Sequence, residues 1–456
     1  MTAHQTQLDL GLENVGLDPV FSTEDEVLDR EGLTSLPEPK GVVFTKKWVV
    51  DLILDLAGYR ADQDLAALYA VEPAAGAGAF FLPMIGRLLD SLDLHKRPLS
   101  DARGAIHAYE LDQRSAAHAI DLTAKELGHR GVNEGTARTI AEGWVTVGDF
   151  LLESRRDRRA DLVVGNPPYI RYDDLPGRTL AVYRKLYPTM VGRCDIYIGF
   201  IEAGLRHLAD GGALAFICAD RWMRSAYGAQ LRRLVANLYA MDVVIEMHNA
   251  PAFEDDVSAY PAVIVIRRAA QGPVLVANAG ATAGPAGNGR PLADLLVDLA
   301  DDRIKSLAGF SATRLEYWFG GHSPWPSVEP AKLTILQRLE ERFHPLEDST
   351  TGTRVGIGVA TGNDGVYITT NGALVEEDRL LPLAMPADTR SGEMRWSGHY
   401  LVDPWQQGRG LVDLTAYPRL RTYFEAHRQE LTLRNIAKRN ARDWYRTIDR
   451  VSHDLT

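Results

Sequence analysis

The amino-acid sequence predicts an α/β protein built around a mostly parallel, doubly wound sheet. Apolar runs of strand length alternate with segments of helical periodicity over residues 41–270. Most connections between successive runs are long enough for the helical crossover that parallel strands need. The last two runs are joined by a short non-helical connection, which favours an antiparallel hairpin at the end of the sheet.

The expected strands follow one another along the first part of the chain. They are 66–73, 105–111, 143–149, 161–166, 212–219, 242–249 and 262–268. Helical periodicity fills most of the gaps between them, as in FFLPMIGRLLDSL at 80–92 and IGFIEAGLRHLA at 198–209. The helices are therefore expected to cover both faces of the sheet.

The chain length predicts more than one domain, because 456 residues exceed what a single hydrophobic core usually holds. Residues 1–40 are acidic and punctuated by Pro and Gly, so we expect a loosely ordered lead-in. Residues 41–270 form the α/β domain. The Gly-, Ala- and Pro-rich stretch VANAGATAGPAGNGRPL at 276–292 predicts a linker or flexible loop. Residues 271–456 are thus expected to hold a linker and a second domain.

The composition is that of an ordinary globular protein, with 45% hydrophobic and 24% charged residues. No apolar run is long enough to span a bilayer, and the N-terminus lacks the order of a secretory signal, so no membrane partner is expected. The two cysteines, Cys194 and Cys218, provide neither a disulfide framework nor a metal cluster, and the histidines show no ligand spacing. These features predict a cytoplasmic protein without a metal site.

The net charge of −11 argues against a generally basic nucleic-acid binder, but one segment differs. From Arg419 to Arg450 the chain carries nine Lys or Arg against four Asp or Glu, interleaved with aromatic residues. Arg434, Lys438 and Arg439 are the side chains expected to contact DNA phosphates. A solvated helical face explains the same segment equally well.

The ends of the first three strands carry residues suited to a nucleoside, and ligands bind at this edge of an open α/β sheet. The first strand ends in EPAAGAG at 72–78, where small residues allow the backbone close to a ligand. Glu110 ends the second strand and can accept hydrogen bonds from ribose hydroxyls. Asp149 and Phe150 end the third, where they can accept an adenine amino hydrogen and stack on the base. Acidic residues at strand ends also cap helices, so the prediction depends on their order.

The fourth strand ends in Asn166-Pro167-Pro168-Tyr169, where two prolines stop both strand and helix. An isolated Pro-Pro pair is most often a simple strand stop. Here the Asn166 side-chain oxygen and the Pro167 carbonyl can accept both hydrogens of an exocyclic amine, which makes its nitrogen more pyramidal and more nucleophilic. The two prolines hold these acceptors in place before the reaction. Tyr169 offers a ring face to the amine-bearing base.

Together these motifs resemble the DNA adenine-N6 methyltransferases of the gamma order, the TaqI-like group that includes restriction-modification methylases. The resemblance is close over residues 41–270 and looser over 350–450. It implies a Rossmann-like, S-adenosyl-L-methionine-dependent methyltransferase fold, with a seven-stranded mixed sheet whose last strand is antiparallel, and a C-terminal α+β target-recognition domain. The implied catalytic residues are Asn166, Pro167, Pro168 and Tyr169. The implied cofactor-binding residues are Thr45, Glu72, Pro73, Ala74, Gly76, Gly78, Glu110, Leu111, Asp149, Phe150 and Asn166. Lys46 departs from the family's usual Thr-Pro.

The resemblance also implies a reaction and its partners. A methyl group would pass from S-adenosyl-L-methionine to N6 of an adenine flipped out of double-stranded DNA. Phe253 or Tyr260 would provide a second aromatic surface for the flipped base. A separate restriction endonuclease or another defence-system subunit would be a further partner.

Three other functions stay open at this point. Enzymes that methylate glutamine in release factors share the NPPY tetrapeptide, often followed by Ile as at Ile170, but they lack so long a segment after the sheet. Cytosine-N4 methyltransferases more often carry Ser at the position of Asn166. A non-catalytic DNA-specificity subunit could retain the same fold. Because the chain ends at SHDLT, the recognition domain is expected to be either short or truncated.

Overall fold

The structure is a computed structural model, and it describes residues 44–451 with several short gaps. The gaps are 154–157, 255–259, 286–288, 302, 304–306, 308, 317–320, 322, 327–329, 357 and 407–409. The lead-in expected at 1–40 lies outside the described residues. The chain forms two compact units, the first ending at Arg342 and the second beginning at Phe343.

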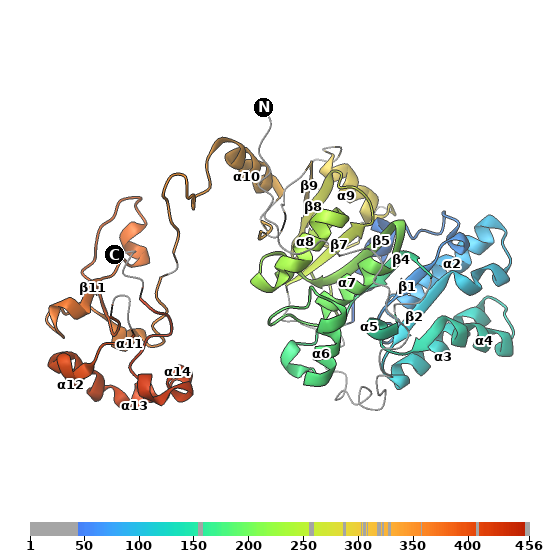
Figure 1. Cartoon of the computed structure of the whole chain (residues 1–456). Coiled ribbons are helices and arrows are strands. Elements are labelled where there is room, and N and C mark those ends of the chain that lie inside the picture. The colour runs from blue at the N-terminus through green and yellow to red at the C-terminus, as the bar shows by residue number, and fades with distance from the viewer. Residues whose placement is uncertain are drawn as a thin grey trace. The chain divides into compact units, whose positions relative to one another are not determined.

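The first unit is built on a mixed sheet, in which nine strands are described (Figure 1). Their order across the sheet is β3-β2-β1-β4-β5-β7-β6-β8-β9. The strands are β1 (Ala70–Glu72), β2 (Ile106–Glu110), β3 (Val145–Val147), β4 (Ala160–Gly165), β5 (Leu208–Ala219), β6 (Ala240–Glu246), β7 (Pro261–Arg267), β8 (Val274–Ala279) and β9 (Phe310–Leu315). β1 to β5 pair in parallel, and β7 runs antiparallel between β5 and β6. The predicted α/β class, the seven expected strands and the antiparallel hairpin are confirmed.

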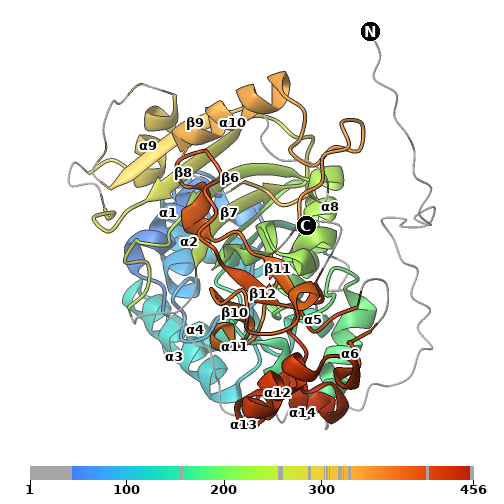
Figure 2. The same cartoon turned by 90° about the vertical axis from the view of Figure 1, so that its left-hand side faces the viewer.

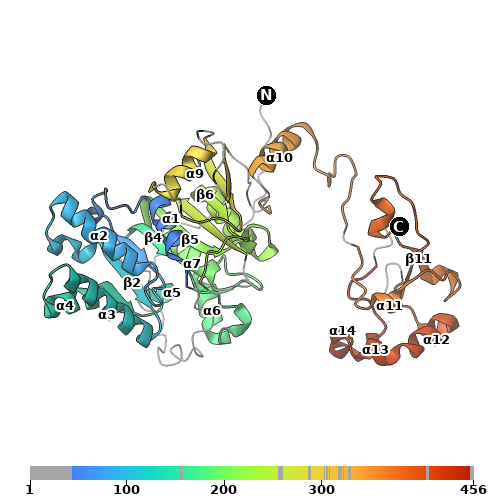
Figure 3. The same ribbon diagram turned by 180° about the vertical axis from the view of Figure 1, so that it is seen from behind.

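Helices cover both faces of the sheet, as expected. They are α1 (Lys47–Leu56), α2 (Phe81–His95), α3 (Gln113–His129), α4 (Glu134–Trp144), α5 (Phe150–Glu153), α6 (Gly177–Leu186), α7 (Tyr197–His207), α8 (Ala229–Leu238), α9 (Leu292–Ala300) and α10 (Pro330–Arg342). α1 lies over β5 with α2 and α9 beside it (Figure 3). α7 and α8 pack on the opposite face, the one seen in Figure 1. In the described part of the chain, no helix combines the length and apolarity that crossing a membrane requires.

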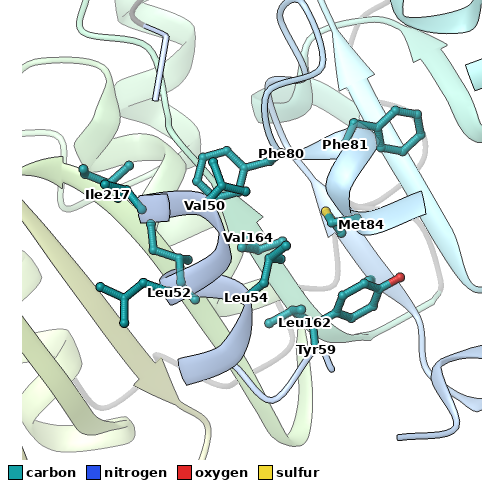
Figure 4. Close-up of a cluster of buried hydrophobic side chains, with 14 of the residues drawn as sticks. Val50, Leu52, Leu54, Tyr59, Phe80, Phe81, Met84, Leu162, Val164 and Ile217 are labelled. Carbon is teal, nitrogen blue, oxygen red and sulfur yellow. The ribbon is translucent and has the colours of Figure 1, made fainter. Parts of the chain in front are cut away.

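The two faces of β5 show why this segment is a buried strand. Ala213, Ala215 and Ile217 belong to the core beneath α1 and α2. Leu214, Phe216 and Cys218 belong to the core beneath α7 and α8. This alternation with a period of two buries both faces, so the run is apolar throughout. Figure 4 shows the first core, where Val50, Leu52 and Leu54 of α1 lie among residues of α2, β4 and β5.

The linker or flexible loop predicted over 276–292 is wrong for residues 276–279, which belong to a strand, and the sheet does not end at the predicted hairpin. Residues 274–279 form β8, which pairs in parallel with β6 from Val243↔Leu275 to Glu246↔Asn278. α9 and α10 lie next to β9, which continues the sheet (Figure 2). Ala277 and Ala279 are buried in this strand, so its alanines reflect close packing and not a flexible linker. The expected domain boundary near residue 270 therefore falls inside the first unit.

The second unit is a small α+β structure, which agrees with the fold class expected after the main sheet. Its described strands are β10 (Ile368–Thr369), β11 (Leu380–Pro382) and β12 (Tyr400–Val402), and they pair antiparallel in the order β10-β12-β11. Its helices are α11 (Asp364–Tyr367), α12 (Pro418–Ala426), α13 (Arg428–Thr432) and α14 (Asn435–Arg439). Tyr367, Leu420, Phe424 and Trp444 contribute to one hydrophobic core, so the unit has a core of its own.

Candidate active site

A cavity of about 490 Å³ lies at the carboxyl ends of β1 to β4. The strand order reverses between β1 and β4, and ligands of open α/β sheets bind at such a reversal. Twelve of the predicted site residues line the cavity: Thr45, Glu72, Pro73, Ala74, Gly76, Glu110, Leu111, Asp149, Phe150, Asn166, Pro167 and Pro168. The other two, Gly78 and Tyr169, are not in its lining. The structure therefore brings most of the predicted residues to one place.

The loop after β1 turns sharply so that its backbone faces the end of β2. Gly76 has φ +52°, a conformation that favours glycine, and its N–H donates to Glu110 Oε2 at 2.7 Å. Gly78 has φ +89°, and a Cβ there would lie 3.2 Å from Leu82 Cγ at the start of α2. Gly78 thus shapes the loop from outside the cavity.

Glu110 is held by two backbone donors. Its Oε2 accepts from Gly76 N, and its Oε1 accepts from Asp112 N at 2.8 Å. Charge-assisted bonds of this kind stabilise a carboxylate and fix its position. Each oxygen keeps a further lone pair for a hydroxyl in the cavity.

Asp149 and Phe150 are supported by residues that the sequence analysis did not identify. Asp149 accepts hydrogen bonds from Leu151 N at 2.9 Å and from the Tyr183 hydroxyl of α6. Burial raises the pKa of Asp149, and the Tyr183 hydroxyl partly offsets that effect. The Phe150 ring stacks on Phe200 of α7, with centroids 5.8 Å apart and planes 26° apart. Tyr183 and Phe200 both line the cavity, but they come from the helices α6 and α7 and do not directly follow a strand, as Asp149 does.

The NPPY loop is anchored at both ends. The Asn166 amide Nδ2 donates to Thr45 Oγ1 at 3.3 Å, while Oδ1 is buried. Thr45 forms an antiparallel bridge with Phe253, so three distant parts of the chain meet beside Asn166. Beyond the loop, the Ile196 N–H donates to the Ile170 carbonyl at 3.0 Å. The backbone of the tetrapeptide is therefore fixed before any ligand arrives.

Tyr169 packs against Phe253 and not against Tyr260. The Tyr169 and Phe253 rings meet edge to face, with centroids 6.4 Å apart, and the Tyr169 hydroxyl lies 3.5 Å from the Ile217 carbonyl. Burial raises the pKa of Tyr169 well above its usual value, so this hydroxyl stays protonated. Tyr260 is 59% exposed and packs edge to face on His248. Of the two expected aromatic partners, Phe253 is the neighbour of the tetrapeptide.

An ion-pair cluster that the sequence did not reveal lies beyond β5 and β6. Asp220, whose side chain is buried, accepts from Arg224 and interacts with His248 Nε2 at 2.7 Å. Arg224 also lies 3.7 Å from Glu246. The hydrogen bond with Asp220 raises the pKa of His248, against the effect of burial. The ligand atoms of Asp220, Glu246 and His248 lie within 4.8 Å of one another, and Arg224 supplies a positive charge to both carboxylates.

In the basic segment of the second unit, Arg434 has a structural role. Its guanidinium donates to the Thr361 carbonyl at 3.1 Å and to the Trp444 and Arg446 carbonyls at 2.8 Å. It also donates to the Tyr367 hydroxyl and the Leu431 carbonyl, and these contacts engage all three of its nitrogens. The expectation that Arg434 contacts DNA phosphate is therefore not supported. Lys438, Arg439 and Arg442 are exposed.

Comparison with known proteins places this site in a family. The family model of the Eco57I restriction-modification methylases matches residues 111–253. The chain is 40% identical to the Type II methyltransferase M.PaeR7I of Pseudomonas aeruginosa, over 96% of this chain and 75% of that protein. It is 37% identical to M.XhoI of Xanthomonas vasicola, over 91% of this chain and 76% of that protein.

Among solved structures, the M protein of the Type I restriction enzyme EcoKI overlays with a TM-score of 0.42. It is 13% identical, over 68% of this chain and 73% of that one. That overlay is loose, and the family assignment rests on the sequence relatives. The chain therefore belongs to the Type II DNA methyltransferases of restriction-modification systems.

Proposed function

We propose that this enzyme methylates the exocyclic N6 of adenine in double-stranded DNA. The observation that carries the proposal is the position of Asn166-Pro167-Pro168 in the lining of a cavity that also contains Glu110 and Asp149. The groups that would accept hydrogen bonds from the target amine and those that would accept them from the cofactor's nucleoside thus line the same cavity. The family name specifies a DNA methyltransferase but not the base that is methylated. The proposal also specifies the base and the atom.

The residues of the cavity fit S-adenosyl-L-methionine, the methyl donor of this class of enzyme. Glu110 can accept from both ribose hydroxyls, because its backbone contacts leave lone pairs unused. Asp149 can accept from the adenine amino group beside the Phe150 ring. When bound, this cofactor supplies a methyl group already activated by its positive sulfur, and the protein supplies position and electrostatics.

Asn166 and Pro167 would activate the adenine amine. The lone pair of this amine is delocalised into the ring, so it is a weak nucleophile. The Asn166 Oδ1 and Pro167 carbonyl would accept its two hydrogens and return the lone pair toward the methyl group. Because the Thr45 contact and the two prolines hold these acceptors, little reorganisation is needed during the reaction.

Tyr169 and Phe253 would form the surface that receives the flipped base. The amine cannot be reached inside a duplex, so the adenine must leave the stack. The two rings already lie edge to face beside the cavity loop, and base–aromatic stacking offsets part of the cost of unstacking. The protonated Tyr169 hydroxyl is suited to this stacking role and not to accepting a proton.

Exposed basic side chains would contact the DNA backbone. Arg171, two residues after the tetrapeptide, and Arg221, two residues after the end of β5, are exposed. Lys438, Arg439 and Arg442 are exposed on the second unit, which would serve as the target-recognition domain. A separate restriction endonuclease acting on the same DNA sequence would be the functional partner.

The decisive experiment is sequencing of plasmid DNA with modified-base detection, from cells with and without this gene. We expect N6-methyladenine at one recurring sequence, and none from cells expressing Asn166→Ala. Detection of N4-methylcytosine would show that the enzyme methylates the amino group of cytosine and not that of adenine. If no modified base is found, calorimetry with S-adenosyl-L-methionine is the next measurement, and absence of binding would favour a non-catalytic specificity subunit.

A further inference from the structure

The chain between β4 and α7 makes an excursion that begins and ends beside the NPPY loop. The carbonyl of Ile170, directly after Tyr169, accepts from the Ile196 N–H at 3.0 Å, so residues 171–195 leave and return at one point. The excursion contains α6, and Figure 1 and Figure 3 both show this helix near the lower edge of the first unit. Its base is therefore next to the tetrapeptide that would meet the target base.

The inner side of α6 is fixed to the wall of the cofactor cavity. The buried Tyr183 donates its hydroxyl to Asp149 Oδ2 at 2.5 Å, and the buried Tyr187 donates to the Leu151 carbonyl at 2.5 Å. Thr179, four residues before Tyr183, is also buried. Residues four apart lie on the same side of a helix, so this side of α6 is held by packing and by two hydrogen bonds.

The outer side of α6 is exposed and basic. Arg178, Ala181 and Lys185 are exposed, and their spacing of three, four and seven positions puts them on one side of the helix, opposite the tyrosines. Among the described residues, no ion pair involves Arg178 or Lys185. Both positive charges are therefore available to a partner.

The whole excursion has an excess of positive charge, although the net charge of the chain is −11. Between residues 171 and 195, all of which the structure describes, the exposed charged side chains are Arg171, Asp173, Asp174, Arg178, Arg184, Lys185 and Arg193. Basic side chains on a helix that is held in place favour a phosphate partner. A helix of this size is about 15 Å long, which corresponds to about four phosphates along one DNA strand.

We propose that the outer side of α6 binds the phosphate backbone of the DNA next to the flipped base, with Arg178 and Lys185 as the principal contacts. This inference rests on the proposed function, which puts the target base at the NPPY loop. It deepens that function by assigning DNA contacts to a helix of the first unit. Phosphate contacts position a duplex without reading its sequence, so α6 would orient the DNA and leave sequence recognition to other residues.

The double variant Arg178→Met/Lys185→Met tests this surface in the full chain. Its DNA is a duplex carrying the sequence that the enzyme methylates in plasmid DNA, and fluorescence anisotropy at several salt concentrations measures binding. We expect affinity about tenfold lower and a salt dependence reduced by about two counterions. The affinity for S-adenosyl-L-methionine, measured by calorimetry, should stay within about twofold, because neither side chain lines the cofactor cavity. Since Tyr183 does line it, this value also shows that α6 is correctly folded.

Arg103→Met/Lys125→Met is the matched control, because it removes the same two kinds of charge from exposed positions elsewhere in the first unit. Arg103 precedes β2, at the edge of the sheet opposite the cavity, and Lys125 lies in α3. This variant should keep its DNA affinity within about twofold of wild type and leave the salt dependence unaltered. Equal losses in the two double variants would show a general effect of net charge and would overturn the inference.

Neutral methylphosphonates, introduced one at a time into the duplex, locate the contact. For the wild-type enzyme, at least one substitution within about four phosphates of the target adenine should weaken binding. The same substitution should have little further effect on Arg178→Met/Lys185→Met, because the contact is already lost. Losses that add at every phosphate, or an unchanged affinity of this variant for DNA, would contradict the assignment. A wild-type chain that neither binds nor methylates DNA would instead refute the proposed function, so the two failures are distinct.

Discussion

Asn166 and Tyr169 lie three residues apart, yet their environments are different. Asn166 lines the cofactor cavity and is held by Thr45, whereas Tyr169 lies outside that lining and packs on Phe253. The first is therefore placed to meet the reacting amine and the second to meet the base that carries it. This separation makes the roles of the two residues experimentally distinguishable.

Replacing Asn166 should affect the chemical step and spare cofactor binding. We expect Asn166→Ala to lower the methyl-transfer rate about 10²–10³-fold, the range found when one preorganised hydrogen-bonding group is removed from an active site. The cofactor dissociation constant should change less than about threefold. Single-turnover transfer of a labelled methyl group, together with calorimetry, measures both quantities. Equal losses in rate and cofactor affinity would contradict the assigned role.

Replacing Glu110 should mainly weaken cofactor binding, in contrast to replacing Asn166. Glu110→Ala removes the carboxylate expected to hold the ribose and leaves the Gly76 N–H without its acceptor. The cofactor should bind more weakly by about 1.5–3 kcal/mol, the value of a hydrogen bond to a charged group. Calorimetry with S-adenosyl-L-homocysteine gives this number directly, and an unchanged affinity would exclude Glu110 from the site.

The His248–Asp220 pair should make stability depend on pH. The pKa of His248 is raised in the folded state, so protonated His248 stabilises the fold. That contribution should be fully present below about pH 6.5, the unfolded value, and should disappear as pH rises through the raised folded pKa. Urea unfolding of wild type and His248→Gln between pH 5 and 9 measures it. A stability difference that is constant over this range would argue against the protonated pair.

At the scale of elements, the sequence was most informative where one strand or loop carries its own signal. The seven strands from β1 to β7 were predictable because each is an apolar run with a clear end. The loops after β1 to β4 were predictable because Glu72, Glu110, Asp149 and Asn166 each follow a strand directly. The carboxyl ends of parallel strands lie at one edge of the sheet. Residues that follow successive strands in the sequence are therefore close together in the structure.

The elements that were missed have no such local signal. β8 is short, and its small residues resemble a linker until the neighbouring β6 is known to bury them. Tyr183 and Phe200 reach the cavity from helices whose orientation depends on tertiary packing. Arg434 looked like a DNA contact because its carbonyl acceptors come from residues up to 73 positions away.

The helices of the second unit offer a matched pair of arginine and lysine variants. Arg434→Met should destabilise this unit by about 2–3 kcal/mol, because it leaves several carbonyl groups without their charged donor. Lys438→Met, on the exposed side of the same segment, should change stability by less than about 0.5 kcal/mol. Thermal unfolding measures both.

The same two variants should rank in the reverse order when DNA binding is measured under conditions where both are folded. Lys438→Met should lower the affinity and reduce the dependence of binding on salt by about one counterion, if Lys438 meets a phosphate. Fluorescence anisotropy at several salt concentrations gives the slope. An unaltered slope would identify Lys438 as solvated surface.

At the scale of the whole molecule, the boundary between Arg342 and Phe343 predicts separable activities. The described residues of the cofactor cavity all belong to the first unit, whereas the exposed basic residues of α14 belong to the second. A chain ending at residue 342 should bind S-adenosyl-L-methionine within about threefold of the full chain and should bind DNA at least tenfold more weakly. Loss of cofactor binding in a folded fragment would show that the second unit completes the cavity.

The bridge between Thr45 and Phe253 has a consequence for biosynthesis. Thr45 emerges from the ribosome early, but its bridge partner Phe253 is made about two hundred residues later, as are Ala252 and Glu254, which hydrogen-bond to the flanking Lys46 and Phe44. Because chains are synthesised from the N-terminus, the wall beside Asn166 cannot assemble until that later segment has been translated. The cofactor cavity of the nascent chain therefore lacks this wall throughout the first half of translation, and it can close only after the segment between β6 and β7 has been made.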